Sequence, residues 1–314
     1  MLKAQKEAGM MKKGAQGNPG GQGAKIVQSH KVLGMFQLRN IGSLLMLAGL
    51  SFPIYAEENY SLSTLLDDVK ATRWESGAVF VGVTGLGFNS WEWGSSKTFH
   101  WKSEGWLEED TYLGGSDKFG HAYTSYAVTN VLYDHLLLQG RSSERALLSA
   151  TLTTQAIMTY MEVLDGFSGK HGFSPEDLIS NLLGSGFAYI RATNPGMREL
   201  IDFRVEYELP AYRGLQFRSN YILALKLSGI NVLRHTPMRF LELQAGYATR
   251  GYVKAEQDDG YVRSRYVLVG VGLNVSELLF GRRVSHETAS INNGRLFFEH
   301  VQLPYIASRR FLGL

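Results

Sequence analysis

The chain has 314 residues, 19% of them charged, and its formal net charge is only +3. Its length allows one or two domains with a real hydrophobic core, and its scattered Lys and Arg residues give no basic patch that would favour a nucleic-acid partner. The sequence has no cysteine, which excludes disulfides, thiolate catalysis and a lipid-modified Cys. Any metal must therefore be held by His and carboxylate ligands, and a divalent ion is the one cofactor left open.

The first 56 residues consist of two different segments. Residues 1–34 are basic and Gly-rich without hydrophobic periodicity, which predicts disorder or an incorrectly assigned start codon. Residues 35–56 contain a basic residue, a short apolar run and a small residue before Glu57, which is the order of a signal peptide. We therefore predict an exported protein, periplasmic or associated with the outer membrane, and an uncleaved anchor is the alternative.

Residues 57–195 are predicted to form a bundle of about four helices. Leucines at helical spacing in residues 57–75 indicate a short amphipathic helix. Residues 77–88 are apolar and Gly-rich, so we favour a buried helix, with a buried strand as the alternative. Ser174, followed by Pro and two acidic residues, is a strong helix start. The longer helices are expected over residues 116–138, 143–161 and 175–192.

Residues 196–314 change to a period of two, which predicts a β-rich domain. We therefore predict an α+β fold, in which an antiparallel meander of about five strands follows the helices, with a hairpin at Gly260. Five strands are too few for a closed transmembrane barrel, so we favour a sheet with one face packed on the helices and keep membrane insertion as the alternative. The expected strands cover residues 200–209, 215–227, 241–247, 267–275 and 295–303.

Four of the five tryptophans fall in residues 89–115. Indole rings prefer half-wet surroundings, so this loop can form a lid or a stacking platform for a glycan or a lipid headgroup. The alternative is a loop held to the bundle by aromatic packing. Trp101 and Trp106 are accordingly candidate ligand-binding residues.

Ionisable residues gather at the ends of helices whose bodies are nearly uncharged. Asp117 and His121 are spaced i,i+4, and Glu162 and Asp165 are spaced i,i+3, so the members of each pair share a helix face. Two such pairs on facing helices can hold a divalent metal or act as an acid and a base. We therefore predict these four residues as metal ligands, and a structural polar network is the alternative.

The same cluster supplies the other candidate site residues. The catalytic candidates are Asp117, His121, Glu162 and Asp177, although Asp177 also suits a capping role at a helix start. Lys118, Asp165 and Asn181 are predicted to bind ligand or to join a polar network, in which Lys118 would form a structural ion pair with Asp117 or Glu162. We expect His171, in a Gly-flanked loop, at the surface.

These motifs resemble a known family. Asp-Lys-Phe-Gly-His-x-Tyr-x-Ser-Tyr at 117–126 is followed by Glu-x-x-Asp-Gly at 162–166 and by Gly-Phe-Ser-x-x-Asp-Leu-x-x-Asn-x-x-Gly at 172–184. The order resembles the YfiM-type predicted periplasmic lipoproteins, a family of unknown function, and is more distantly similar to VanZ-like proteins. The resemblance covers about 75–192 and implies an envelope location. It also implies a shared polar centre formed by Asp117, Lys118, His121, Glu162, Asp177 and Asn181.

Two functions follow from the sequence. The first is a non-enzymatic envelope scaffold that its sheet attaches to the outer membrane or to a protein partner. The alternative is a metal-dependent or acid–base envelope enzyme, or a binding protein, acting on a glycan or lipid headgroup. Geometry should separate them: side chains converging on a solvent-accessible cavity favour the second, and salt bridges from Lys118 that fill this space favour the first.

Overall fold

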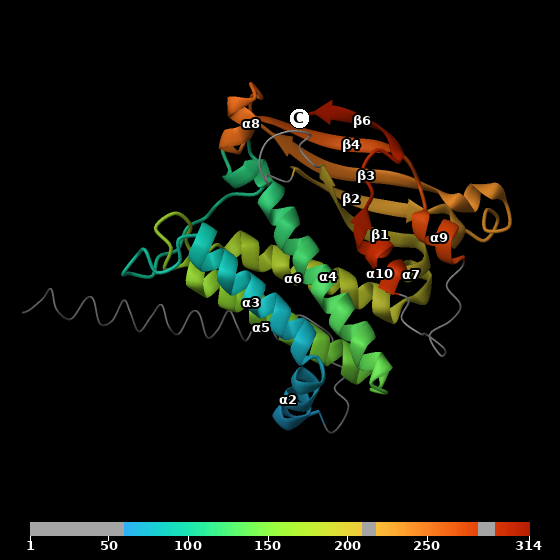
Figure 1. Ribbon diagram of the computed structural model, residues 1–314, viewed down its shortest axis with the longest axis horizontal. Helices are drawn as coiled ribbons and strands as arrows, with labels where there is room; N and C mark the ends of the chain where they lie inside the picture. Colours follow the sequence, from blue (N-terminus) through green and yellow to red (C-terminus); the bar gives the residue numbers. More distant parts are fainter. Residues whose placement is uncertain (1–59, 209–217, 282–292) are drawn as a thin grey trace, which may run out of the picture. The chain divides into compact units, whose positions relative to one another are not determined.

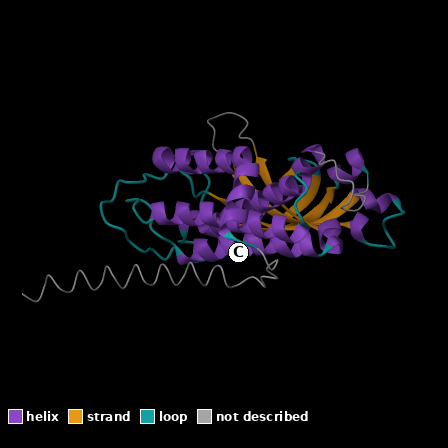
Figure 2. Cartoon of the chain, turned by 90° about the horizontal axis from the view of Figure 1, so that it is seen from below, coloured by secondary structure: helices purple, strands orange, loops and turns teal. Residues whose placement is uncertain are grey.

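The computed structural model describes residues 60–208, 218–281 and 293–314 (Figure 1). These residues fall within one compact unit. Helices occupy the N-terminal part of this unit and a sheet follows them, so the predicted α+β class is confirmed. Figure 2 shows the strands as one group beside the helices. The predictions of disorder over residues 1–34 and of a signal peptide over residues 35–56 lie outside the described residues.

The predicted helices form where their capping signals place them. The Ser142 and Ser174 side chains each accept a hydrogen bond from a backbone N–H of the first helical turn, as N-caps do. The apolar segment over residues 77–88 lies inside a helix, as favoured, but its predicted burial is wrong, because Val81, Leu86 and Phe88 are more than half exposed. No described helix combines the length and the apolar character needed to cross a bilayer. The helices are α2 (Leu62–Ala71), α3 (Arg73–Ser90), α4 (Ser116–Leu138), α5 (Ser143–Asp165) and α6 (Pro175–Thr193).

Helix α4 is the central element, because it packs against α5 and α6 and also against the first three strands of the sheet. Helices α4 and α6 come very close together at Gly184, where an added Cβ would collide with the carbonyl oxygen of Ala122. Both atoms at this contact belong to the backbones of packed helices. This crossing therefore fixes how α6 presents its first turns to α4.

We expect Gly184→Ala to lower the free energy of unfolding by about 1–3 kcal/mol, because the methyl group forces α4 and α6 apart. Urea denaturation followed by circular dichroism measures the effect. The matched control is Gly82→Ala on α3, where no atom lies within 4 Å of the added Cβ. That change should raise stability by up to about 1 kcal/mol through helix propensity. Equal effects of both changes would contradict the close crossing.

The sheet has six strands in the order β5-β1-β2-β3-β4-β6. The meander of β1 to β4 is antiparallel as predicted, but β5 runs parallel to β1, so a purely antiparallel sheet is wrong. Strand β6 pairs antiparallel with β4. The strands are β1 (Ile201–Glu208), β2 (Arg218–Lys226), β3 (Leu241–Arg250), β4 (Ser264–Leu273), β5 (Val301–Gln302) and β6 (Ala307–Gly313).

The last strand predicted, over residues 295–303, is mostly helix α10 (Asn293–His300). Tertiary contacts hold this helix: Arg295 donates to the carbonyl oxygens of Phe280 and Gly281, at the end of α9 (Val275–Phe280). Strands β3 and β4 form the expected hairpin, whose connection contains the short helix α8 (Lys254–Asp258) and a left-handed turn at Gly260 with φ 86°. One further short helix, α7 (Pro195–Leu200), leads into β1.

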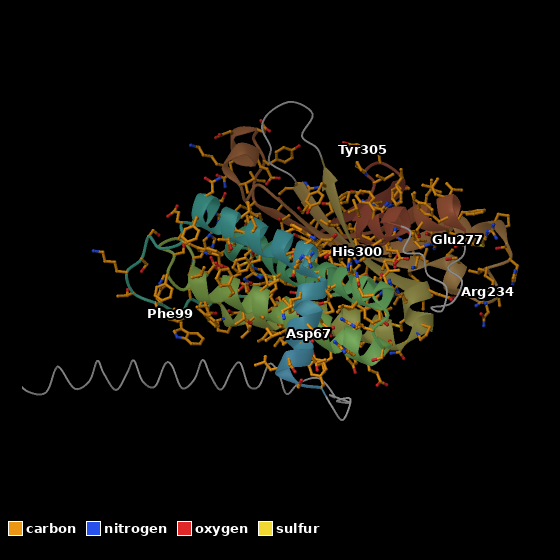
Figure 3. All side chains as sticks on the ribbon, turned by 60° about the horizontal axis from the view of Figure 1, so that its bottom comes forward. Asp67, Phe99, Arg234, Glu277, His300 and Tyr305 are labelled. Atoms are coloured by element: carbon orange, nitrogen blue, oxygen red, sulfur yellow. The ribbon has the colours of Figure 1, made fainter. Side chains whose placement is uncertain are left out.

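One face of the sheet packs on α4 through aromatic rings. Phe119 stacks on Tyr221 and Tyr247, with ring centroids 6.0 and 4.8 Å apart. Tyr123 packs edge-on against Phe203 of β1. The favoured interpretation, in which one sheet face packs on the helices, therefore holds for part of this face, while Leu223, Leu243 and Val271 on the same face stay exposed. His300, labelled in Figure 3, lies at the same junction, where its carbonyl oxygen accepts a hydrogen bond from the Tyr123 hydroxyl.

The opposite face of the sheet carries a buried network of charged side chains. Asp202 is fully buried and contacts Arg204 at 2.6 Å and Lys226 at 2.8 Å. The network is enclosed because the segment 301–313 pairs with both edge strands, through β5 on one side and β6 on the other. Only four residues separate β5 from β6, so the two edges lie close together and the sheet is strongly curled.

Candidate functional site

Three helices bring the predicted site residues to one place. The first two turns of α4 carry Lys118 and His121, the last turn of α5 carries Glu162, and the first turns of α6 carry Asp177 and Asn181. The chain enters α4 through Tyr112–Gly115, where Leu113 has φ 50° and the two glycines after it are also left-handed. This turn directs the start of α4 toward the ends of α5 and α6.

These helices enclose a cavity of about 140 Å³. Asp117 and His121 keep 17% and 13% of their side-chain surface exposed, so solvent reaches the cavity. No arginine or lysine is among the described residues that line it. Four carboxylates in its wall outnumber the two cations at the site, which are the His121 imidazolium and the adjacent Lys118 ammonium group. The ionisable side chains in its wall are Glu104, Asp117, His121, Asp165, His171 and Asp177.

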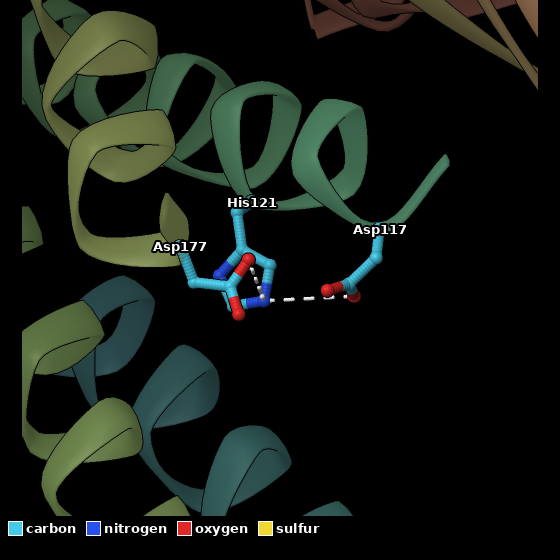
Figure 4. A group of neighbouring side chains, drawn as sticks. All are labelled: Asp117, His121 and Asp177. Carbon is cyan, nitrogen blue, oxygen red and sulfur yellow. Dashed lines mark ion pairs between the residues drawn. The ribbon is translucent and has the colours of Figure 1, made fainter. Parts of the chain in front are cut away.

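The imidazole of His121 is held on one side and open on the other. Its Nδ1 lies 3.2 Å from Oε1 of the buried Glu162 and 3.3 Å from Oδ1 of Asn181. Its Nε2 lies 3.6 Å from Oδ1 of Asp117 and 3.8 Å from Oδ1 of Asp177, both beyond hydrogen-bond range (Figure 4). Asn181 thus holds the ring by a hydrogen bond, Glu162 lies at ion-pair distance from the same nitrogen, and Nε2 faces the space between two carboxylates.

Lys118 makes salt bridges beside the cavity. Its Nζ lies 2.6 Å from Asp177, 3.1 Å from Asp117 and 3.2 Å from Glu104. This network was only partly predicted, because the sequence pointed to Asp117 or Glu162 as the partner and missed Glu104. The backbone beside Glu104 is held to the segment that precedes α6 by the hydrogen bond from Lys102 N–H to the Phe173 carbonyl oxygen. No spacing rule links such a loop carboxylate to α4.

Burial and mutual charge shift the ionisation of these groups. Burial raises the pKa of Asp117 to about 6 and that of Asp165 to about 7. Burial alone would lower the pKa of His121, but the carboxylates of Asp117, Asp177 and Glu162 outweigh it and raise the value to about 9. Several groups in the cavity therefore ionise near neutral pH, a property that clusters at functional sites.

Asp165 and Glu162 take different positions from the two carboxylates nearest His121. Asp165 lines the cavity, and its Oδ1 accepts a hydrogen bond of 2.7 Å from the indole N–H of Trp93. Glu162 contacts His121 behind the cavity wall. The closest group of ligand atoms among the described residues comes from Asp117, His121 and Asp177, all within 4.8 Å of one another. The predicted metal set of Asp117, His121, Glu162 and Asp165 shares two members with it.

His171 is buried, so its predicted surface position is wrong. Its backbone N–H is held by the Ser168 hydroxyl, and its ring packs edge-on against Tyr112. Burial lowers the pKa of His171 to about 4, which keeps the ring neutral. Flanking glycines suggested an exposed turn, but Gly172 is needed because an added Cβ would collide with the Lys102 side chain.

The tryptophan loop packs on the bundle, and Trp101 and Trp106 lie outside the cavity wall. Trp101 contacts Phe173, with ring centroids 4.5 Å apart, and Trp106 is largely exposed. Trp91 does line the cavity, and the buried Trp93 holds Asp165. The loop therefore supplies site residues, although other tryptophans than those singled out from the sequence.

A second cavity, of about 160 Å³, lies between the start of α4 and the sheet. It shares Leu113 and Asp117 with the first cavity. Tyr221 and Tyr252 contribute aromatic rings to its wall, and Thr249 contributes a hydroxyl group. The two cavities therefore adjoin at Leu113 and Asp117.

Comparison with known proteins finds a family model that matches the part of the chain carrying this site. Residues 103–193 match a family described as predicted periplasmic lipoprotein (DUF2279). The match covers α4, α5 and α6 and every ionisable residue of the cavity, and it leaves α3 and the sheet outside. It supports the resemblance to a predicted periplasmic lipoprotein family and an exported, periplasmic protein; similarity to VanZ-like proteins stays a prediction. No curated protein and no solved structure matches the chain.

Proposed function

We propose that this chain is an exported cell-envelope protein that binds a small ligand carrying positive charge in the carboxylate-lined cavity. The observation that carries the proposal is the convergence of Glu104, Asp117, Asp165 and Asp177 on one solvent-accessible space. Anionic ligands such as phosphate esters are disfavoured there by like-charge repulsion. The ammonium group of an amino sugar or of a lipid headgroup fits this potential.

A structural function is the second candidate, and the position of Lys118 favours it. This buried cation contacts three carboxylates from two helices and a loop, which would fix the register of the bundle without any ligand. The network leaves the cavity beside it unfilled, because Lys118 is not in the cavity wall. This favours ligand binding as the main function, with Lys118 holding the site together.

Ligand-observed NMR tests the binding function directly. Ethanolamine and glucosamine should show saturation transfer from the protein, whereas phosphate and glucose 6-phosphate should not. In the double variant Glu104→Gln/Asp165→Asn, the affinity for both amines should fall at least about tenfold, because two carboxylates are lost. The Asn at 165 keeps an acceptor for Trp93, and circular dichroism checks folding. Phosphate binding as strong as amine binding, or no binding of either amine, would refute the proposal.

A further inference from the structure

The atoms around His121 Nε2 have the spacing of a metal site. Nε2 is 3.6 Å from Oδ1 of Asp117 and 3.8 Å from Oδ1 of Asp177, and Figure 4 shows it directed between the two carboxylates. Bonds of about 2.0–2.2 Å around a tetrahedral zinc ion place neighbouring ligand atoms roughly 3.3–3.6 Å apart. The observed separations are too long for hydrogen bonds and close to this value.

The other side of the imidazole is arranged as metal-ligating histidines require. A histidine that binds metal through one ring nitrogen usually donates the other N–H to a carboxylate or carbonyl group. Here Nδ1 faces Oε1 of Glu162 at 3.2 Å and Oδ1 of Asn181 at 3.3 Å. Glu162 is 1% exposed, so its carboxylate is fixed within the protein.

A second observation in the same cavity points to a ligand. His171 lines the cavity and is 9% exposed, and its Nε2 has no hydrogen-bond partner among the described residues. Buried polar atoms are nearly always paired, so an unpaired imidazole nitrogen at a cavity wall indicates a missing partner. A metal-bound water or ligand in the cavity would supply one.

We propose that Asp117, His121 and Asp177 hold a divalent zinc-like ion, with a coordination position left open to the cavity. This inference rests on the proposed function, since it names the cation that the carboxylate-rich cavity accepts. Three protein ligands with an open fourth position are typical of catalytic rather than structural zinc. Lys118 contacts Oδ2 of Asp117 at 3.1 Å, which leaves Oδ1 of that carboxylate directed toward His121. Lys118 also contacts Oδ1 of Asp177 at 2.6 Å, so Asp177 would bridge the ammonium group and the ion.

Isothermal titration of the metal-stripped full chain with zinc chloride tests the proposal, and cobalt(II) absorption reports the coordination geometry. We expect one ion per chain and a visible spectrum of tetrahedral type. His121→Gln should weaken zinc binding at least about a hundredfold, and Glu162→Gln about 10- to 100-fold through the orientation of the ring. The matched control is Glu176→Gln, which removes a carboxylate from the same turn of α6 that faces Ser103 instead of the cavity. It should leave zinc affinity unchanged.

Two results would overturn the metal site. One is the absence of zinc and cobalt binding by the wild-type chain, and the other is zinc binding that His121→Gln leaves intact. If glucosamine binds to the wild-type chain and zinc does not, the metal site is refuted and the proposed function stands. If zinc binds and neither amine binds, the metal site is supported and the proposed amine ligand is refuted. The cobalt spectrum of the unmodified chain keeps the test valid if a variant fails to fold.

Discussion

Lys118→Met is expected to lower the free energy of unfolding by about 3–5 kcal/mol, because it leaves three carboxylates without their shared buried cation. Burial alone would lower the pKa of Lys118, but the carboxylates outweigh it and raise this pKa above its ordinary value. A raised pKa means that the stabilisation is complete below about pH 10 and is lost only as the pH rises further. Urea denaturation at pH 7 therefore measures the whole effect.

The control for this change is Lys70→Met, which removes an exposed cation paired with Asp67 at 3.6 Å. Exposed pairs of this kind contribute about 0–1 kcal/mol, so little change is expected. If Lys118→Met cost no more than Lys70→Met, Lys118 would not hold the cavity carboxylates together. That outcome would also remove the main argument for a structural function.

Asp202→Asn should be destabilising by a similar amount, about 3–5 kcal/mol, because it leaves the cations of Arg191, Arg204 and Lys226 without their common carboxylate. These three cations outweigh the effect of burial and hold the pKa of Asp202 below its usual range. A lowered pKa gives stability that is present above about pH 4 and is lost as the pH falls below it. Denaturation at pH 7 again measures the whole effect.

Asp67→Asn is the matched control, since Asp67 is an exposed carboxylate that pairs with Lys70 at 3.6 Å. The difference between the Asp202 and Asp67 variants should shrink when both are measured below pH 4. A difference that stayed constant across this range would show that the cost arises from packing and not from charge.

The helices that carry the site were predictable because their signals are local. Serine caps and Pro175 mark where α5 and α6 begin, and i,i+4 spacing placed Asp117 and His121 on one face of α4. Each of these rules works within a few residues. The convergence of α4, α5 and α6 then followed from the short connections between them.

The charged interior of the sheet was not predictable from the same kind of pattern. A period of two in β1 separates Asp202, Arg204 and Glu206 from the apolar positions, and such charges ordinarily face solvent. Here they face inward, because β5 and β6 fold the two edges toward each other. The parallel pairing of Val205 with Val301 joins residues far apart in the sequence, and no local signal marks it.

The segment that closes the sheet also sets the order of folding. Strands β1 and β4 keep an unpaired edge until residues 301–313 are available, and Arg309 of this segment completes the inner network by pairing with Glu206 at 2.6 Å. A ribosome releases these residues after all the other strands. The sheet therefore cannot close before the last strand of the chain has been synthesised.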